Sequence, residues 1–159
     1  MNENNLEKII NNIVGDAIVK EVMSLKLAVK LIETVEEKAA EMGLAVVVAV
    51  SDASGRPIAV HCMDGAYHGS FDVAVNKTYT STAFQMSTAK LSRLCQPGQD
   101  LYGLQFSNNG KVMILGGGEP LMVGKTMIGA LGVSGGSAQE YSDLAAYGAS
   151  ALKEVIKCL

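Results

Sequence analysis

The chain alternates between segments with the apolar spacing of helices and shorter apolar runs typical of strands. Seven consecutive apolar residues at 44–50 match the length of one buried strand. A turn containing Gly55 separates them from a second predicted strand at residues 57–63. Over residues 71–86, apolar side chains recur at steps of three and four, which predicts a helix. The central unit is therefore a strand hairpin followed by a helix.

A second amphipathic helix is predicted before this unit, and a short one after it. The earlier helix covers residues 25–42 and follows Ser24, a residue type favoured at helix N-caps. Glu36 belongs to its charged face, which is typical of a solvated surface without a site. The short helix is predicted at residues 87–94, before a loop built around Pro97-Gly98.

The remaining residues predict three strands and a final helix. The strands are expected at residues 111–115, 121–123 and 126–133. The helix follows Ser137, because Ser-Ala-Gln-Glu at residues 137–140 has the spacing of a capping box. Strands joined by hairpins form antiparallel sheets, so the expected fold is an α+β layer fold with helices packed on a five-stranded sheet.

Residues 1–23 are predicted to form a separate amphipathic helix before the main domain at residues 24–159. Its apolar stripe consists of Leu6, Ile9, Ile10, Ile13, Val14, Ala17 and Ile18. Such a stripe either packs on the domain or a neighbouring subunit, or docks into the groove of a partner protein. Its pattern resembles the encapsulation peptides that carry enzymes into bacterial microcompartments.

Composition narrows the class of protein. The 159 residues carry a formal net charge of -3 and no tryptophan, and their basic residues do not cluster. These properties argue against a nucleic-acid or anionic-membrane partner. Three cysteines without a CxxC spacing indicate a reducing setting and neither a zinc site nor a disulfide framework. The acidic, Asn-rich N-terminus does not resemble a secretory signal, so we expect a cytoplasmic protein.

The common catalytic motifs are missing from the sequence. The sequence lacks the glycine fingerprint of dinucleotide-binding proteins. It also lacks the spacing of a phosphate loop, because five residues separate Gly118 from Gly124 where such a loop needs four. The zinc-hydrolase and serine-hydrolase motifs are absent as well. His61 and Cys62 are neighbours in a predicted strand and would point to opposite faces, which disfavours a Cys–His dyad. We expect a binding protein more than an enzyme.

The candidate ligands for a metal-containing cofactor lie around the exit of the second strand. Strand alternation places His61 and Met63 on one face, and His68 follows in the next loop. Both imidazole and thioether groups ligate heme iron. Lys77, in the predicted helix, either binds a carboxylate or phosphate or is an ordinary solvated charge.

Five blocks of sequence resemble, in order, those of the GlcG/HbpS family, which also forms the C-terminal domain of PduO-type corrinoid adenosyltransferases. The blocks are VAVSDASG at 48–55, MDGA at 63–66, KTYT at 77–80, GGGEPL at 116–121 and IGALGVSGG at 128–136. The resemblance covers roughly residues 24–156 and is nearest to small members that accompany diol and glycerol dehydratase genes. Cys62 stands where many relatives carry Arg, and Tyr141 where they commonly carry Asp.

This resemblance implies a profilin-like three-layer fold with a five-stranded antiparallel sheet between helices, assembled into homo-oligomers that are often octamers. It also implies binding of heme or, as the alternative, a corrinoid. The candidate cofactor-binding residues are His61, Met63, Asp64, Gly65, His68, Lys77 and Thr88. Among them, residue chemistry makes His61 the expected iron ligand, with Met63 or His68 as alternatives, and Lys77 would pair with a heme propionate.

Three functions remain as hypotheses. The favoured one is a non-enzymatic heme- or corrinoid-binding accessory protein of a diol- or glycerol-type catabolic system, in the cytoplasm or inside a microcompartment. The second is an enzyme or sensor for a small carboxylate, aldehyde or hydroxyacid that uses Asp64, Lys77 and the loop at residues 116–118. The third is a structural module that residues 1–23 recruit to a shell or to a dehydratase-system partner.

Overall fold

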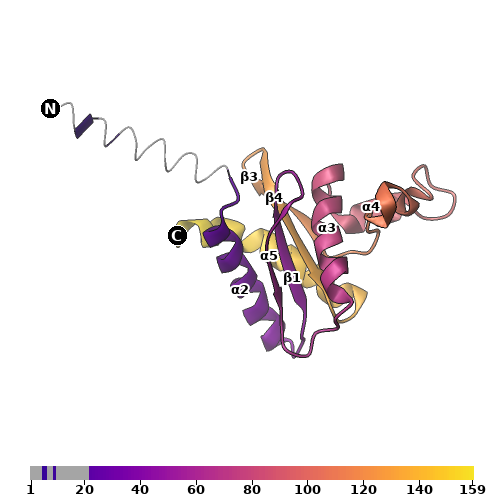
Figure 1. The fold of residues 1–159 in the computed structure, drawn as a ribbon, viewed down its shortest axis with the longest axis horizontal. Helices are drawn as coiled ribbons and strands as arrows, with labels where there is room; N and C mark the ends of the chain where they lie inside the picture. The colour runs from indigo at the N-terminus through magenta and orange to yellow at the C-terminus, as the bar shows by residue number, and fades with distance from the viewer. Residues whose placement is uncertain (1–4, 7–8, 10–21) are drawn as a thin grey trace.

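The structure is a computed structural model that describes residues 5, 6, 9 and 22–159 (Figure 1). The amphipathic helix predicted over residues 1–23 therefore falls mostly outside the described residues, and both its role and the boundary at residue 24 stay predictions. Its last residue, Met23, is described, and its side chain is buried against the start of the main domain.

Four antiparallel strands form one sheet in the order β2-β1-β4-β3, so that β2 and β3 are its edges. The described elements are α2 (Leu25–Glu41), β1 (Val47–Asp52), β2 (Pro57–Cys62), α3 (Ser70–Phe84), α4 (Thr88–Leu94), the 3₁₀ turns η1 (Leu104–Phe106) and η2 (Asn108–Gly110), β3 (Gly118–Val123), β4 (Thr126–Ser134) and α5 (Ala138–Lys157). This confirms an α+β fold with an antiparallel sheet flanked by helices.

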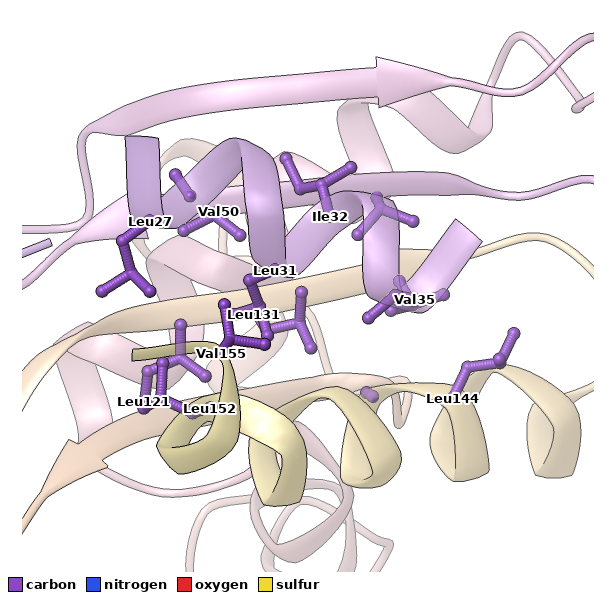
Figure 2. Packing of buried hydrophobic residues seen from close by; sticks show 14 of the residues in the cluster. Leu27, Leu31, Ile32, Val35, Val50, Leu121, Leu131, Leu144, Leu152 and Val155 are labelled. Atoms are coloured by element: carbon purple, nitrogen blue, oxygen red, sulfur yellow. The ribbon is translucent and has the colours of Figure 1, made fainter. Parts of the chain in front are cut away.

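Helices cover both faces of the sheet, with α2 and α5 on one side and α3 on the other (Figure 1). The central strand β1 shows this directly, because Val48 and Val50 pack against α2 and α5 while Val47 and Ala49 pack toward α3. The larger core forms where α2 and α5 close on the sheet (Figure 2). Alternating side chains of a strand point to opposite faces, so the first four residues of β1, at 47–50, are all apolar.

The prediction of a strand at residues 111–115 is wrong, and the described residues form a sheet of four strands where five were expected. These residues run along α3 and α4 instead of pairing with a strand. The Met113 N–H donates to Thr80 Oγ1 of α3 at 2.8 Å, and Val112 is buried beside Leu91 and Cys95. A short apolar run can be buried by helices as well as by a sheet, and its sequence does not separate the two cases.

Helix α3 lies unusually close to the sheet because β4 carries Gly132 beneath it. A Cβ atom on Gly132 would collide with the backbone oxygen of Ala74, and one on Gly118 of β3 would lie 2.9 Å from the backbone oxygen of Lys77. The buried side of α3 is also polar, with Lys77 and several hydroxyl residues against the strands. This close, polar contact between α3 and the sheet positions Lys77, one of the candidate residues.

Candidate functional site

The imidazole of His61 lies on the α2 face of edge strand β2. His61 pairs with Val48 of β1, whose side chain belongs to the core beneath α2 and α5. From α2, Glu36 reaches the ring, and both of its carboxylate oxygens lie 3.2 Å from His61 Nδ1. The His61 side chain stays 36% exposed, against 24% for Glu36, so the pair lies at the surface and not within the core.

The Glu36 carboxylate gives His61 a defined orientation. An acceptor at Nδ1 favours the tautomer that carries its proton there, which leaves the lone pair on Nε2. Among the hydrogen bonds of the described residues, none involves His61 Nε2. The arrangement therefore presents one imidazole nitrogen that is held in place and is available to a metal ion or a ligand.

The other candidates around the end of β2 are less confined. Met63 shares the face of His61, packs partly against the α2 and α5 core, and donates its backbone N–H to Val46 at 3.1 Å. Asp64 and Gly65 form the exposed turn that follows, where Gly65 takes a φ of 85°. His68 is exposed just before α3. His61 and Met63 thus form a pair, while the other three belong to the loop between β2 and α3.

Lys77 lies in a different environment, between α3 and the end of the sheet. The whole residue is buried, and its Nζ donates a hydrogen bond of 2.7 Å to the backbone oxygen of Val133 on β4. The amine also lies 3.6 Å from the ring centroid of Tyr141, at the start of α5. Gly117 permits this packing, since a Cβ atom there would be 3.0 Å from Nζ and 2.9 Å from the Tyr141 ring.

Thr88 supports the same region from α4. Its Oγ1 accepts a hydrogen bond of 2.9 Å from the backbone N–H of Gly118, which fixes the start of β3 beside α3. Ser81, also on α3, is fully buried, and its Oγ has no hydrogen-bond partner. Thr88 and Lys77 are therefore brought together with the glycine segment at residues 116–118, while His61 and Met63 lie on the opposite face of the sheet.

The Lys77 amine has no carboxylate partner among the described residues, since none of their ion pairs involves it. Burial lowers the pKa of the Lys77 amine from 10.5 to about 7, because a charged ammonium loses its hydration there. At neutral pH the amine therefore exists in both protonation states, which is unusual for a lysine.

Two residues of these sites were not identified from the sequence. Glu36 was expected to lie on a plain solvated face, and only the packing of α2 over β2 brings it to His61, 25 residues along the chain. Tyr141 was singled out as a departure from the family pattern, but the sequence did not indicate that its ring contacts Lys77. Neither contact has a local sequence signal, since each joins elements distant in the chain.

Two negative findings apply to the described residues. They contain no group of three or more His, Cys, Asp or Glu side chains arranged to hold a metal ion. Within the same part of the chain, the helices are too short or too polar to cross a membrane. A metal bound by a single protein side chain, as in heme, does not require such a group.

Comparison with known proteins gives several relatives. A 15.0 kDa protein from the dhaT-dhaS intergenic region of Citrobacter freundii is 38% identical over 118 residues, which are 74% of this chain and 83% of that protein. The corrinoid adenosyltransferase PduO of Salmonella typhimurium is 38% identical over 109 residues, 69% of this chain. That match spans only 32% of PduO, so most of that enzyme has no counterpart here.

Solved structures agree with this relationship. Protein ORFY of Klebsiella pneumoniae is 35% identical with a TM-score of 0.80, over 82% of this chain and 90% of that one. A complex of PduOC with heme is also 35% identical, with a TM-score of 0.78 over 82% and 94% of the two chains. The family model described as "Haem degrading protein HbpS-like" matches residues 23–150. The chain therefore belongs to the HbpS-like family.

Proposed function

We propose that this protein binds heme, and that His61 is the residue that ligates the iron. The observation that carries the proposal is the contact between His61 and Glu36, which leaves Nε2 available on a partly exposed imidazole. In heme-ligating histidines, the N–H of the second ring nitrogen commonly donates a hydrogen bond to an acceptor that fixes the ring. The heme complex of PduOC, which is 35% identical to this chain, supports the same ligand class.

The residues near His61 fit such a ligand. Glu36 would orient the imidazole and make it a stronger donor, because a carboxylate at Nδ1 increases the electron density at Nε2. Met63 would give an apolar contact on the same face. Bound heme would supply a redox-active iron, while this chain's residues hold and orient it. We infer a binding accessory protein and not an enzyme, with a corrinoid as the alternative ligand.

Within one subunit, Lys77 and Thr88 lie on the α3 side of the sheet, whereas His61 lies on the α2 side. The sheet separates them from His61, because α3 and α2 pack on opposite faces. A propionate held by Lys77 therefore does not follow from the arrangement of a single chain. Asp64, Gly65 and His68 lie in the loop next to β2, and they remain proposed contacts at the margin of the ligand.

We further propose a homo-oligomer, with an octamer as the expected form, in the cytoplasm or inside a bacterial microcompartment. The exposed position of His61 on an edge strand supports this, since a second copy would cover a ligand that one subunit leaves open. The link to diol or glycerol catabolism is supported by the gene region after which the Citrobacter relative is named. In a microcompartment, residues 1–23 would recruit the protein to the shell or to a dehydratase-system partner.

A hemin titration followed by absorption tests the ligand and its site. The wild type is compared with His61→Ala, His68→Ala and Glu36→Gln, and cobalamin is titrated in parallel. We expect a saturable Soret shift that His61→Ala abolishes and His68→Ala retains. Glu36→Gln should weaken binding by about tenfold, the usual effect of removing a partner that orients a metal ligand. A Soret shift unchanged in His61→Ala would refute the assigned ligand.

The sedimentation of the same samples separates ligand binding from assembly. If hemin binding requires a second copy, the affinity for hemin should fall as the protein is diluted below the dissociation constant of the oligomer. An absence of any spectral change with hemin, together with saturable binding of cobalamin, would replace heme with a corrinoid. No response to either tetrapyrrole would reject the proposed function.

A further inference from the structure

The most unusual group outside the heme proposal is the amine of Lys77. It is the largest side chain among the fully buried residues that the structure describes, and no carboxylate neutralises it. Burying an unpaired charge is expensive, so proteins retain such lysines mainly where their chemistry is used. Nothing in the proposed heme site uses this amine, because it lies on the other face of the sheet.

The contacts of Nζ suit a neutral amine better than an ammonium. A neutral amine has two N–H groups, and here one donates to the Val133 oxygen at 2.7 Å while the Tyr141 ring offers its π face at 3.6 Å. Its lone pair is then left unused. An ammonium would carry a third N–H, for which the described residues offer no hydrogen-bond acceptor besides the Val133 oxygen. The lowered pKa of Lys77 agrees with this assignment.

The amine is fully buried, and the ring that contacts Nζ belongs to Tyr141, which is itself partly exposed. Gly117 has a φ of 93° and lacks the Cβ atom that would press on Nζ and on the Tyr141 ring. The surroundings are nevertheless tight, since the Val133 oxygen lies 2.7 Å from that Cβ position. A reactant can therefore reach the amine only if the Tyr141 ring moves aside, which favours a small, unbranched molecule.

We propose that Lys77 is a nucleophilic amine that captures small aldehydes as imines. The Nζ lone pair attacks the carbonyl carbon, a C–N bond forms, and the carbonyl π electrons move to oxygen, which takes a proton from solvent. The nitrogen loses one proton to water. The carbinolamine hydroxyl then takes one proton from water, the nitrogen lone pair expels it as water, and the product is a protonated imine that keeps the remaining N–H. Amine, aldehyde and one proton thus give a protonated imine and water, with no oxidant or reductant.

The same contacts stabilise that product. A protonated imine keeps one N–H group, which can still donate the hydrogen bond to the Val133 oxygen. Its positive charge lies over the Tyr141 ring, where a cation–π contact is favourable. An aldehyde carries a single substituent on its carbonyl carbon and so fits beside Gly117 more easily than a ketone. The proposal does not depend on heme, because no residue is shared between the two sites.

Reductive trapping tests this proposal with the intact wild-type protein. The protein is incubated with propanal and sodium cyanoborohydride at pH 7, and the labelled lysines are identified by peptide mass spectrometry. Lys90, exposed on α4, provides an internal comparison within the same chain. We expect Lys77 to be labelled at least about tenfold faster than Lys90, since an ordinary exposed lysine is almost fully protonated at this pH. That preference should disappear when the chain is unfolded in urea.

Two further measurements complete the test. The labelling rate of Lys77 should level off above about pH 8, whereas that of an ordinary exposed lysine keeps rising to much higher pH. Tyr141→Leu removes the ring and should slow trapping, while Tyr141→Phe retains the ring and should leave it unchanged. Labelling of Lys77 no faster than Lys90 in the folded protein would overturn the proposal. Thermal stabilisation by propionate without any labelling of Lys77 would also overturn it, in favour of an anion site.

Discussion

Replacing Lys77 with methionine should remove a pH dependence from the stability of this protein. The amine has a pKa of 10.5 in the unfolded chain and about 7 in the folded one, because burial disfavours its charged form. Between these two values the unfolded state binds more protons than the folded state. The free energy of unfolding therefore rises with pH in this window, and the penalty is fully present below about pH 7.

The magnitude follows from the two pKa values. The full difference corresponds to about 5 kcal/mol, and the part recovered between about pH 7 and about pH 9 is roughly 2 kcal/mol. Lys77→Met keeps most of the apolar stem and removes the titrating group. The contribution of Lys77 to the slope of unfolding free energy against pH should therefore vanish. The variant also leaves the Val133 oxygen without its donor, which changes absolute stability but not the pH dependence.

Urea unfolding at pH 7, 8 and 9 measures the effect in the wild type, in Lys77→Met and in Lys90→Met. The last variant removes an exposed lysine and should follow the wild type at every pH. The informative quantity is the difference between the wild-type and Lys77→Met slopes, because other groups titrate equally in both proteins. Parallel slopes for these two proteins would refute the claim that Lys77 is buried without a counter-charge.

Three further predictions concern the frame that holds the sites. Gly132→Ala should destabilise the fold by about 3 kcal/mol or more, since the new Cβ meets the backbone oxygen of Ala74, which cannot move aside cheaply. Gly69→Ala, with open space around its Cβ position, is the matched control, and equal melting temperatures for the two variants would contradict the argument. Ser137→Ala should cost about 1 kcal/mol in chemical denaturation by breaking the capping box of α5; no loss would mean that Glu140 alone caps the helix. The Glu140 carboxylate accepts a hydrogen bond from the Ser137 backbone N–H, which lowers its pKa below the usual 4.5. The wild type should therefore lose a little stability on acidification below about pH 4.5, and Glu140→Gln should remove this loss in denaturation measured across that range.

The sequence predicted most of the fold because most elements carry their own local signal. The hairpin of β1 and β2, the α3 helix and the capping box of α5 are all confirmed, with boundaries shifted by a few residues. The strand at residues 111–115 is wrong because burial, and not pairing, explains its apolar residues. Periodicity reports that a side chain is buried, but it does not say whether a sheet or a helix buries it.

The two candidate sites were harder to predict than the fold. Strand alternation placed His61 and Met63 on one face, and the structure agrees. The same reasoning could not show that Lys77 lies on the face of the sheet opposite His61, since that depends on which face each helix covers. The partners of both groups, Glu36 and Tyr141, arrive from elements far away in the sequence. Long-range packing of this kind leaves no pattern in a single chain.

The edge strands have a consequence for how copies of this protein can meet. Pro120 of β3 pairs with Ala130, and the neighbouring Val133 N–H donates to Gly117 across the same ladder. In this register the backbone nitrogen of residue 120 faces outward, where proline has no hydrogen to offer. Pro57 likewise opens the opposite edge strand, β2. Prolines on both edge strands discourage a neighbouring molecule from adding its own strand to the sheet, which disfavours aggregation through the sheet edges.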